Sequence, residues 1–192
     1  MSQDRSAYSQ ARSGASTALP ARILVAYASE FGATSTIAAV IGEVLRAGGS
    51  TVDVRTIVDV GNLSGYNAVV LGSAIYNGEW LPEAVHFVHF HEPALRRIPV
   101  AFFAVSMTMR EDTPEHRRIV LEYLEPVRTA APHLEPVSIG LFAGRMDYHK
   151  LPLLERLRFW LRARLPAGDY RDWAAIRAWA AEVRPMLVPD ER

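Results

Sequence analysis

Residues 23–34, which read ILVAYASEFGAT, constrain the fold more than any other part of the chain. The first five of them are apolar on both faces of an extended chain, as is typical of a central parallel strand that helices cover on each side. A short turn with hydroxyls and one glycine follows, and a helical pattern runs from about Ala33 to Ala47. Such a turn directs backbone N–H groups, hydroxyls and the positive end of a helix at one point, which favours a bound phosphate.

Two other phosphate-binding motifs fit this turn poorly. A nucleotide P-loop requires G-x-x-x-x-G-K-[ST], and a dinucleotide fingerprint requires G-x-G-x-x-G, whereas this turn has one glycine and no lysine. A turn rich in hydroxyls between a strand and a helix is also common as an ordinary helix cap. The other turns of the chain are therefore needed to distinguish a phosphate site from an ordinary helix cap.

The rest of the chain repeats the alternation of strand and helix. Apolar or alternating runs predict four more strands, at residues 51–57, 68–71, 100–105 and 137–142. Helices are predicted to begin at Pro82, at Pro114 behind the N-cap Thr113, and near Asp172. We therefore expect an α/β fold with a doubly wound, five-stranded parallel sheet of order 2-1-3-4-5. Ligands of such sheets bind beyond the carboxyl ends of the strands at the switch point, here between strands 1 and 3.

Composition excludes several classes of function. The 192 residues suffice for one domain, which we expect at residues 21–188. Residues 1–20 are mostly small and polar, so we expect them to form a disordered tail. Lys+Arg and Asp+Glu both number 21, so the net charge argues neither for nucleic acid nor for an acidic electron carrier. The absence of cysteine excludes disulfides, thiol catalysis and thiolate metal sites. No apolar run reaches the roughly 18 residues of a spanning helix, and we expect a cytoplasmic protein.

Three histidines in the second predicted helix raise the question of a metal site. His86, His89 and His91 have no carboxylate partner at a ligand spacing, so a solvated helix face is the preferred interpretation and no metal is expected. The sequence shows neither a Ser-His-Asp arrangement nor a pair of catalytic carboxylates.

Three turns together resemble the flavodoxin-like superfamily. The form Ser-x-Phe-Gly-x-Thr is similar to the flavodoxin FMN-phosphate loop [TS]-x-T-G-x-T, with Phe31 in place of the middle threonine. The stretches SGYNAVVLGSAIYNG (residues 64–78) and AFFAVSM (residues 101–107) extend the resemblance, although Asn67 stands where an acid is common. The later AGRMDY turn and DYRDW motif resemble the flavodoxin-type, quinone-dependent protoporphyrinogen IX dehydrogenases.

The resemblance implies an FMN site built from the three turns. The FMN phosphate would be held by amides and hydroxyls of Ser29, Glu30, Phe31, Gly32, Ala33 and Thr34. One side of the flavin would be lined by Ser73, Ala74, Ile75, Asn77, Gly78 and Tyr76, the last as the stacking ring. The polar edge of the ring would meet the backbone of Ser106, Met107, Thr108, Met109 and Arg110. No catalytic side chain can be assigned.

The resemblance favours an enzyme over an electron carrier. Met107 and Met109 stand where single-electron flavodoxins place a second aromatic ring, which leaves one flavin face open to a substrate; methionines also commonly fill gaps near a core. We expect an FMN-dependent oxidoreductase that passes electrons from a porphyrinogen-like donor to a quinone. The alternatives are a flavodoxin-type electron carrier, an NAD(P)H:quinone reductase, and a non-enzymatic interaction module with a flavodoxin fold.

A basic segment bounded by Leu151 and Leu165 is the last feature. Its arginines Arg156, Arg158 and Arg162 fall off the arc of its leucines at helical spacing, which predicts a basic amphipathic helix. Such a helix suits an anionic membrane surface, here the inner face of the membrane, or an acidic substrate. A helix that simply packs on the sheet edge with a solvated face explains the same pattern.

Overall fold

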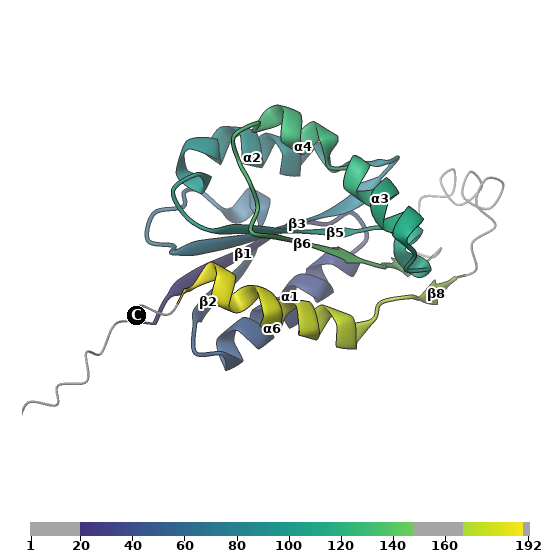
Figure 1. The fold of residues 1–192 in the computed structure, drawn as a ribbon, viewed down its shortest axis with the longest axis horizontal. Helices are drawn as coiled ribbons and strands as arrows, with labels where there is room; N and C mark the ends of the chain where they lie inside the picture. The colour runs from purple at the N-terminus through teal and green to yellow at the C-terminus, as the bar shows by residue number, and fades with distance from the viewer. Residues whose placement is uncertain (1–19, 148–166, 190–192) are drawn as a thin grey trace, which may run out of the picture.

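The computed structural model describes residues 20–147 and 167–189, and its centre is a parallel β-sheet (Figure 1). The strands are β1 (Arg22–Ala28), β2 (Thr51–Thr56), β3 (Ala68–Tyr76), β5 (Val100–Val105) and β6 (Ser138–Phe142). They pair in the order β2-β1-β3-β5-β6, all parallel, which confirms the predicted fold class and strand order. The predicted tail, apart from Pro20, and the segment bounded by Leu151 and Leu165 lie outside the described residues.

Helices cover both faces of the sheet (Figure 1). One layer contains α1 (Ala33–Ala47) and α6 (Trp173–Leu187), and the other contains α2 (Pro82–Leu95), α3 (Pro114–Glu122) and α4 (Glu125–Ala130). Short 3₁₀ turns η1 (Ile57–Asp59) and η2 (Met107–Arg110) follow β2 and β5. Among the described residues, no helix is both long and apolar enough to cross a membrane.

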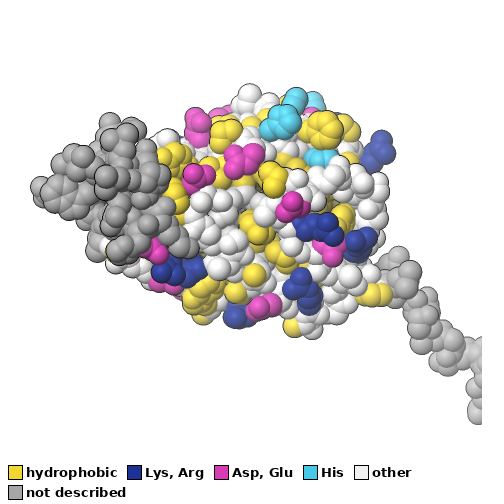
Figure 2. Space-filling model, turned by 180° about the vertical axis from the view of Figure 1, so that it is seen from behind, with side chains coloured by type: hydrophobic (Ala, Val, Ile, Leu, Met, Phe, Trp, Pro, Cys, Tyr) yellow, Lys and Arg dark blue, Asp and Glu magenta, His cyan; other side chains and the backbone are white. Residues whose placement is uncertain are grey.

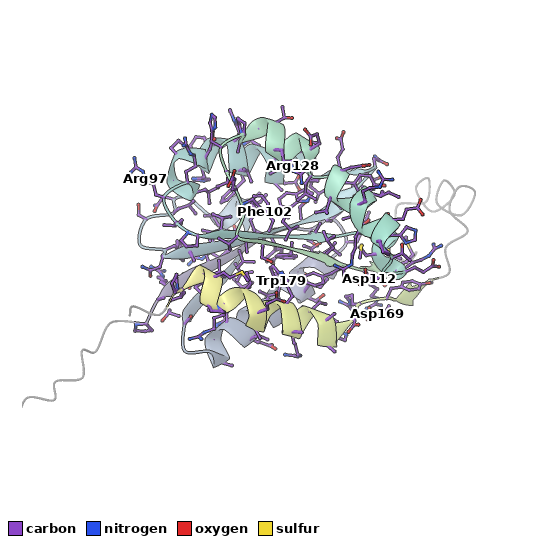
Figure 3. The ribbon with its side chains drawn as sticks, viewed as in Figure 1. Arg97, Phe102, Asp112, Arg128, Asp169 and Trp179 are labelled. Carbon is purple, nitrogen blue, oxygen red and sulfur yellow. The ribbon has the colours of Figure 1, made fainter. Side chains whose placement is uncertain are left out.

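The central strand β1 separates two hydrophobic cores. Ile23 and Val25 pack against the α1 and α6 layer, Leu24 packs against the α2 layer, and all three are 0% exposed. Figure 3 shows the same division, with Phe102 on the α2 and α4 side and Trp179 on the α6 side. Helices on both faces of β1 thus explain why its residues are apolar throughout and do not alternate with polar ones.

The strand β3 is longer than predicted and ends in a hairpin. The region expected to be a turn from Gly72 onward stays extended to Tyr76, and β4 (Glu79–Trp80) then pairs with it antiparallel. The two residues between them, Asn77 and Gly78, have φ values of 53° and 84°, which suits a two-residue hairpin turn. An Asn-Gly pair is the usual sequence signal for this turn, so the hairpin was legible in the sequence.

Asn67 has a structural role at the opposite edge of the sheet. Its Oδ1 accepts a hydrogen bond from Arg22 N, and its own N–H donates to Arg22 O, both at 2.8 Å. The Arg22 guanidinium and the Tyr66 hydroxyl both donate to Asp53 Oδ2, at 2.7 and 2.6 Å. Asn67 therefore joins β1 to β3 at the amino ends of the strands.

A glycine in β3 generates a prediction about stability. A Cβ added at Gly72 would lie 1.9 Å from Phe103 Cζ, and Phe103 is 0% exposed. Gly72→Ala should therefore lower the free energy of unfolding by about 1–3 kcal/mol, the usual cost of overpacking a core. The matched control is Gly61→Ala, whose Cβ would meet nothing within 4 Å. Denaturant midpoints measure the difference, and equal midpoints for the two variants would contradict the packing described here.

Candidate functional site

A cavity of about 230 Å³ lies at the carboxyl ends of the parallel strands. This is the edge of the sheet where topology places ligands of such folds. Three segments predicted for the site reach the cavity through Ser29, Phe31, Ala33, Thr34, Ala74, Ile75, Tyr76, Asn77, Gly78, Ser106, Met107 and Thr108. It is also lined by Val105, Tyr123, Gly144, Arg145, Met146 and Asp147, which were not predicted.

The turn after β1 is held by its own hydroxyls and leaves the start of α1 uncapped. Ser29 Oγ accepts a hydrogen bond from Gly32 N at 3.1 Å, and Ser35 Oγ donates to Gly32 O at 2.8 Å. Gly32 has a φ of 87°, a left-handed conformation that favours glycine. No side chain in the described part of the chain caps α1, and the first turn of the helix contains no acid. The N–H groups at the start of α1 therefore retain their capacity to bind an anion.

Thr34 provides a test of whether a phosphate fits this turn. The residue lines the cavity and is 1% exposed, yet within the described part of the chain its Oγ1 has no hydrogen-bond partner. Leaving a buried hydroxyl without a partner costs about 1–3 kcal/mol. An oxygen of a phosphate bound at the start of α1 would accept this hydrogen bond, so the residues of the turn fit the group.

Phe31 joins the turn after β1 to the β3–β4 hairpin. Its ring centroid lies 6.4 Å from that of Tyr76, with an angle of 60° between the ring planes. This distance and tilt are within the range of favourable aromatic pairs. The residue that replaces a hydroxyl in the flavodoxin pattern therefore contributes an apolar wall next to Tyr76.

The turn after β5 places only part of its predicted residues in the cavity. Met107 and Thr108 line it, and Ser106 Oγ accepts a hydrogen bond from Thr108 N at 3.2 Å. Met109 is 5% exposed and belongs to the α2-side core, as expected of a methionine that fills a gap. Arg110 is exposed and pairs with Glu111 at 3.7 Å.

Three further predicted residues do not line the cavity. Glu30 is exposed, and Gly32 shapes the turn through its backbone. Ser73 is 0% exposed, and its Oγ accepts a hydrogen bond from Leu81 N at 3.1 Å. Ser73 therefore secures the hairpin that carries Tyr76.

The turn after β6 contributes the remaining wall of the cavity. β7 (Arg145–Met146) pairs with β8 (Gly168–Asp169) in a two-stranded antiparallel ribbon. Arg145 pairs with Asp147 at 3.1 Å, and a Cβ at Gly144 would lie 3.3 Å from Val105 Cγ1. Because this turn follows the carboxyl end of a parallel strand, its position in the site was predictable from topology alone.

Arg171 ties the β8 strand to the start of α1. Its side chain is 9% exposed, donates to the Asp169 carboxylate, and reaches Thr36 Oγ1 at 2.5 Å. The hydrogen bonds from Arg171 lower the pKa of Asp169 below its usual value, against a smaller opposing effect of burial. Figure 3 shows Asp169 beside the end of α6 that faces the ribbon.

The histidines of α2 lie away from this cavity. Figure 2 shows histidine side chains gathered at the top of one face of the molecule. His89 Nδ1 lies 3.0 Å from Ala130 O, and burial lowers the pKa of His91, whose ring packs on Phe87 at 4.4 Å. Within residues 20–147 and 167–189, no group of three or more His, Cys, Asp or Glu side chains is arranged to hold a metal ion.

The sheet order and the phosphate-directed turn define a flavodoxin-like protein. The chain belongs to the flavodoxin family, since the model of the Flavodoxin domain matches residues 24–172. A solved archaeal flavodoxin has the same fold, with a TM-score of 0.53, 16% identity, and coverage of 86% of this chain and 98% of its own. Membership of this family indicates a flavin cofactor.

Curated relatives narrow the comparison further. The chain is 27% identical over 140 residues to a protein of Leishmania major named protoporphyrinogen IX dehydrogenase [quinone]. That match covers 66% of this chain and 58% of the Leishmania protein. A protein of the same name from Escherichia coli K12 is 22% identical over 175 residues, which cover 84% of this chain and 94% of the relative.

The Asp169–Arg171 contact predicts a pH-dependent contribution to stability. Because the pKa of Asp169 is lower in the folded protein, its contribution is fully present above the unfolded pKa of about 3.9 and is lost as the pH falls through the folded pKa. Asp169→Asn should therefore lower the melting temperature at pH 7, and the difference from wild type should shrink below about pH 4. Thermal unfolding across this pH range measures it. A difference that is the same at both ends would refute the role of this carboxylate.

Proposed function

We propose that the protein is an FMN-dependent oxidoreductase that passes electrons from a porphyrinogen-like donor to a quinone. The single observation that carries flavin binding is the buried hydroxyl of Thr34, which has no partner within the described residues and lies at the uncapped start of α1. An anion at this point gains the helix N–H groups, the helix dipole and this hydroxyl together. One such turn, without a dinucleotide fingerprint, favours a mononucleotide.

The residues around the cavity have distinct proposed roles toward FMN. Ser29, Ala33 and Thr34 hold the phosphate, and Tyr76 packs on the ring system. The backbone of Ser106 and Met107 meets the polar edge of the ring, where N–H dipoles favour negative charge. When bound, the flavin supplies reversible two-electron chemistry, and the protein supplies position and electrostatics.

The overall reaction balances without another co-reactant. A porphyrinogen-like donor loses two electrons and two protons at each turnover, and a quinone gains both to become a quinol. The assignment of this donor and acceptor is supported by relatives at 27% and 22% identity that are named for these substrates. The zero net charge of the chain favours an enzyme over an electron carrier. A carrier docks to partner proteins, and a charged surface would steer that docking.

The basic segment bounded by Leu151 and Leu165 lies between β7 and β8 along the chain, and β7 lines the cavity. We propose that its arginines meet the anionic groups of a carboxylated substrate or of lipid head groups, each cation contributing about 1 kcal/mol near an anionic surface. Peripheral contact with the membrane remains a prediction, as do a cytoplasmic location and a single domain at residues 21–188.

Thr34 generates a prediction that separates binding from stability. Thr34→Val removes a hydroxyl that no other described residue bonds, so the free protein should unfold at an unchanged or slightly higher denaturant midpoint. Its Kd for FMN should rise about 10- to 100-fold, because a hydrogen bond to a charged phosphate is lost. Titration of the fluorescence of FMN measures the Kd.

The control for Thr34→Val is Thr36→Val. The Thr36 hydroxyl already donates to Ala33 O at 2.8 Å and lies outside the cavity lining. This variant should lose stability and keep its Kd for FMN within about twofold, the reverse of the Thr34 result. Equal Kd values for Thr34→Val and wild type would remove Thr34 from the phosphate site.

The reaction generates a second prediction. In the absence of oxygen, a porphyrinogen should bleach the blue absorption band of the FMN-loaded protein, and a quinone should restore it. Fast bleaching by NAD(P)H and none by a porphyrinogen would place the protein among quinone reductases. Stable one-electron reduction without turnover would identify a carrier. Failure of the wild-type protein to take up FMN at saturating concentration would leave a non-enzymatic interaction module.

A further inference from the structure

Tyr123 lines the cavity from an element that none of the three predicted turns includes. It follows α3 and precedes α4, on the α2 side of the sheet. A Cβ added at Gly78 would lie 3.4 Å from Tyr123 Cε1 and 3.7 Å from its Cδ1. The edge of the Tyr123 ring therefore faces the tip of the β3–β4 hairpin, close enough that a methyl group at Gly78 would reach it.

The backbone of Tyr123 is fixed by its neighbours. Tyr123 N donates to Ile119 O at 3.3 Å, and the next residue, Leu124, is 1% exposed in the core. Val120, one turn earlier, is 0% exposed. Since packed residues on both sides anchor this corner, the ring is presented to the cavity in a preorganised position.

The aromatic residues in the described lining of the cavity come from three different segments. The turn after β5 contributes Met107 and Thr108 to the lining and no aromatic ring. Phe31 and Tyr76 contact each other and come from the turn after β1 and from the hairpin. Tyr123 is the aromatic residue that the α3 side adds to the described lining of the cavity.

We propose that Tyr123 contacts the ring system of the bound flavin, supplying from the α3–α4 corner the aromatic wall that the turn after β5 lacks. The inference rests on the proposed binding of FMN. The ring faces the hairpin at Gly78, and the same hairpin carries Tyr76, so a planar group packed on the hairpin would lie next to both tyrosines. An electron-rich phenol in contact with a flavin quenches its fluorescence and adds stacking affinity.

The experiment uses the full chain reconstituted with FMN and compares three variants with wild type. Tyr123→Leu removes the ring and should raise the Kd for FMN about 2- to 13-fold, the loss of one aromatic contact. The fluorescence of the bound flavin should rise at the same time. Tyr123→Phe keeps the ring but has a poorer electron donor, so its Kd should stay within about twofold of wild type while the fluorescence rises in part.

Val120→Ala is the control for packing. Val120 lies on α3 in the same core and does not line the cavity, so its truncation should lower the denaturant midpoint. It should leave the fluorescence of the bound flavin unchanged. If Tyr123→Leu behaves like Val120→Ala, with lower stability and unchanged flavin fluorescence, Tyr123 only packs the corner and the inference is overturned.

Further outcomes also test the proposed contact between Tyr123 and the flavin. A raised KM for the quinone with an unchanged Kd and fluorescence for FMN would assign Tyr123 to the substrate and overturn the contact proposed here. If Tyr123→Leu does not fold, the fluorescence of Tyr123→Phe decides, since an unchanged value would refute contact. Failure of the wild-type protein to bind FMN would overturn the proposed function together with this inference. If the wild-type protein binds FMN and the Tyr123 variants have the same Kd and the same flavin fluorescence, only this inference is overturned.

Discussion

The site depends on the parallel pairing of the central strand β1 with both of its neighbours. Ile23 and Val25 face one helical layer and Leu24 the other, so the position of β1 is set by two cores at once. The turn at its carboxyl end is therefore held at the switch point of the sheet, beside the ends of β3 and β5. A strand packed on one face only would not hold the start of α1 in register with the hairpin and the turn after β5.

The start of α1 lacks interactions that would stabilise the ligand-free protein. The helix has no side-chain cap, and the hydroxyl of Thr34 is buried without a partner among the described residues. Capping would contribute about 1 kcal/mol, and pairing the hydroxyl would contribute a similar amount. The surrounding turn is well bonded, since Ser29 and Ser35 both bond to Gly32. Around this turn, the missing interactions are those of the α1 N-terminus and of the Thr34 hydroxyl, as expected where structure is arranged for an anionic ligand.

Much of the fold and about two thirds of the cavity lining were predictable from the sequence. The double-sided apolar runs of β1 and β3 identified buried parallel strands, and the turn from Ser29 to Thr34 identified one wall of the cavity. Met109 lies in the α2-side core, which the sequence could not show because a methionine has the same pattern in a core and in a site. Tyr123 could not be found, since it lies at a helix end, and only tertiary packing brings it to Gly78, 45 residues earlier in the chain (123 − 78).

Phe31 shows how a departure from a family pattern can serve a site. A threonine here would offer a hydroxyl to the phosphate, whereas Phe31 packs its ring 6.4 Å from that of Tyr76. In the proposed FMN site, the backbone N–H groups and the helix dipole would bind the phosphate without that hydroxyl, so the loss of affinity would be limited. In exchange, the Phe31 ring lies beside that of Tyr76 in the cavity lining. In the proposed site, the substitution would therefore exchange a contact to the phosphate for apolar surface in the cavity.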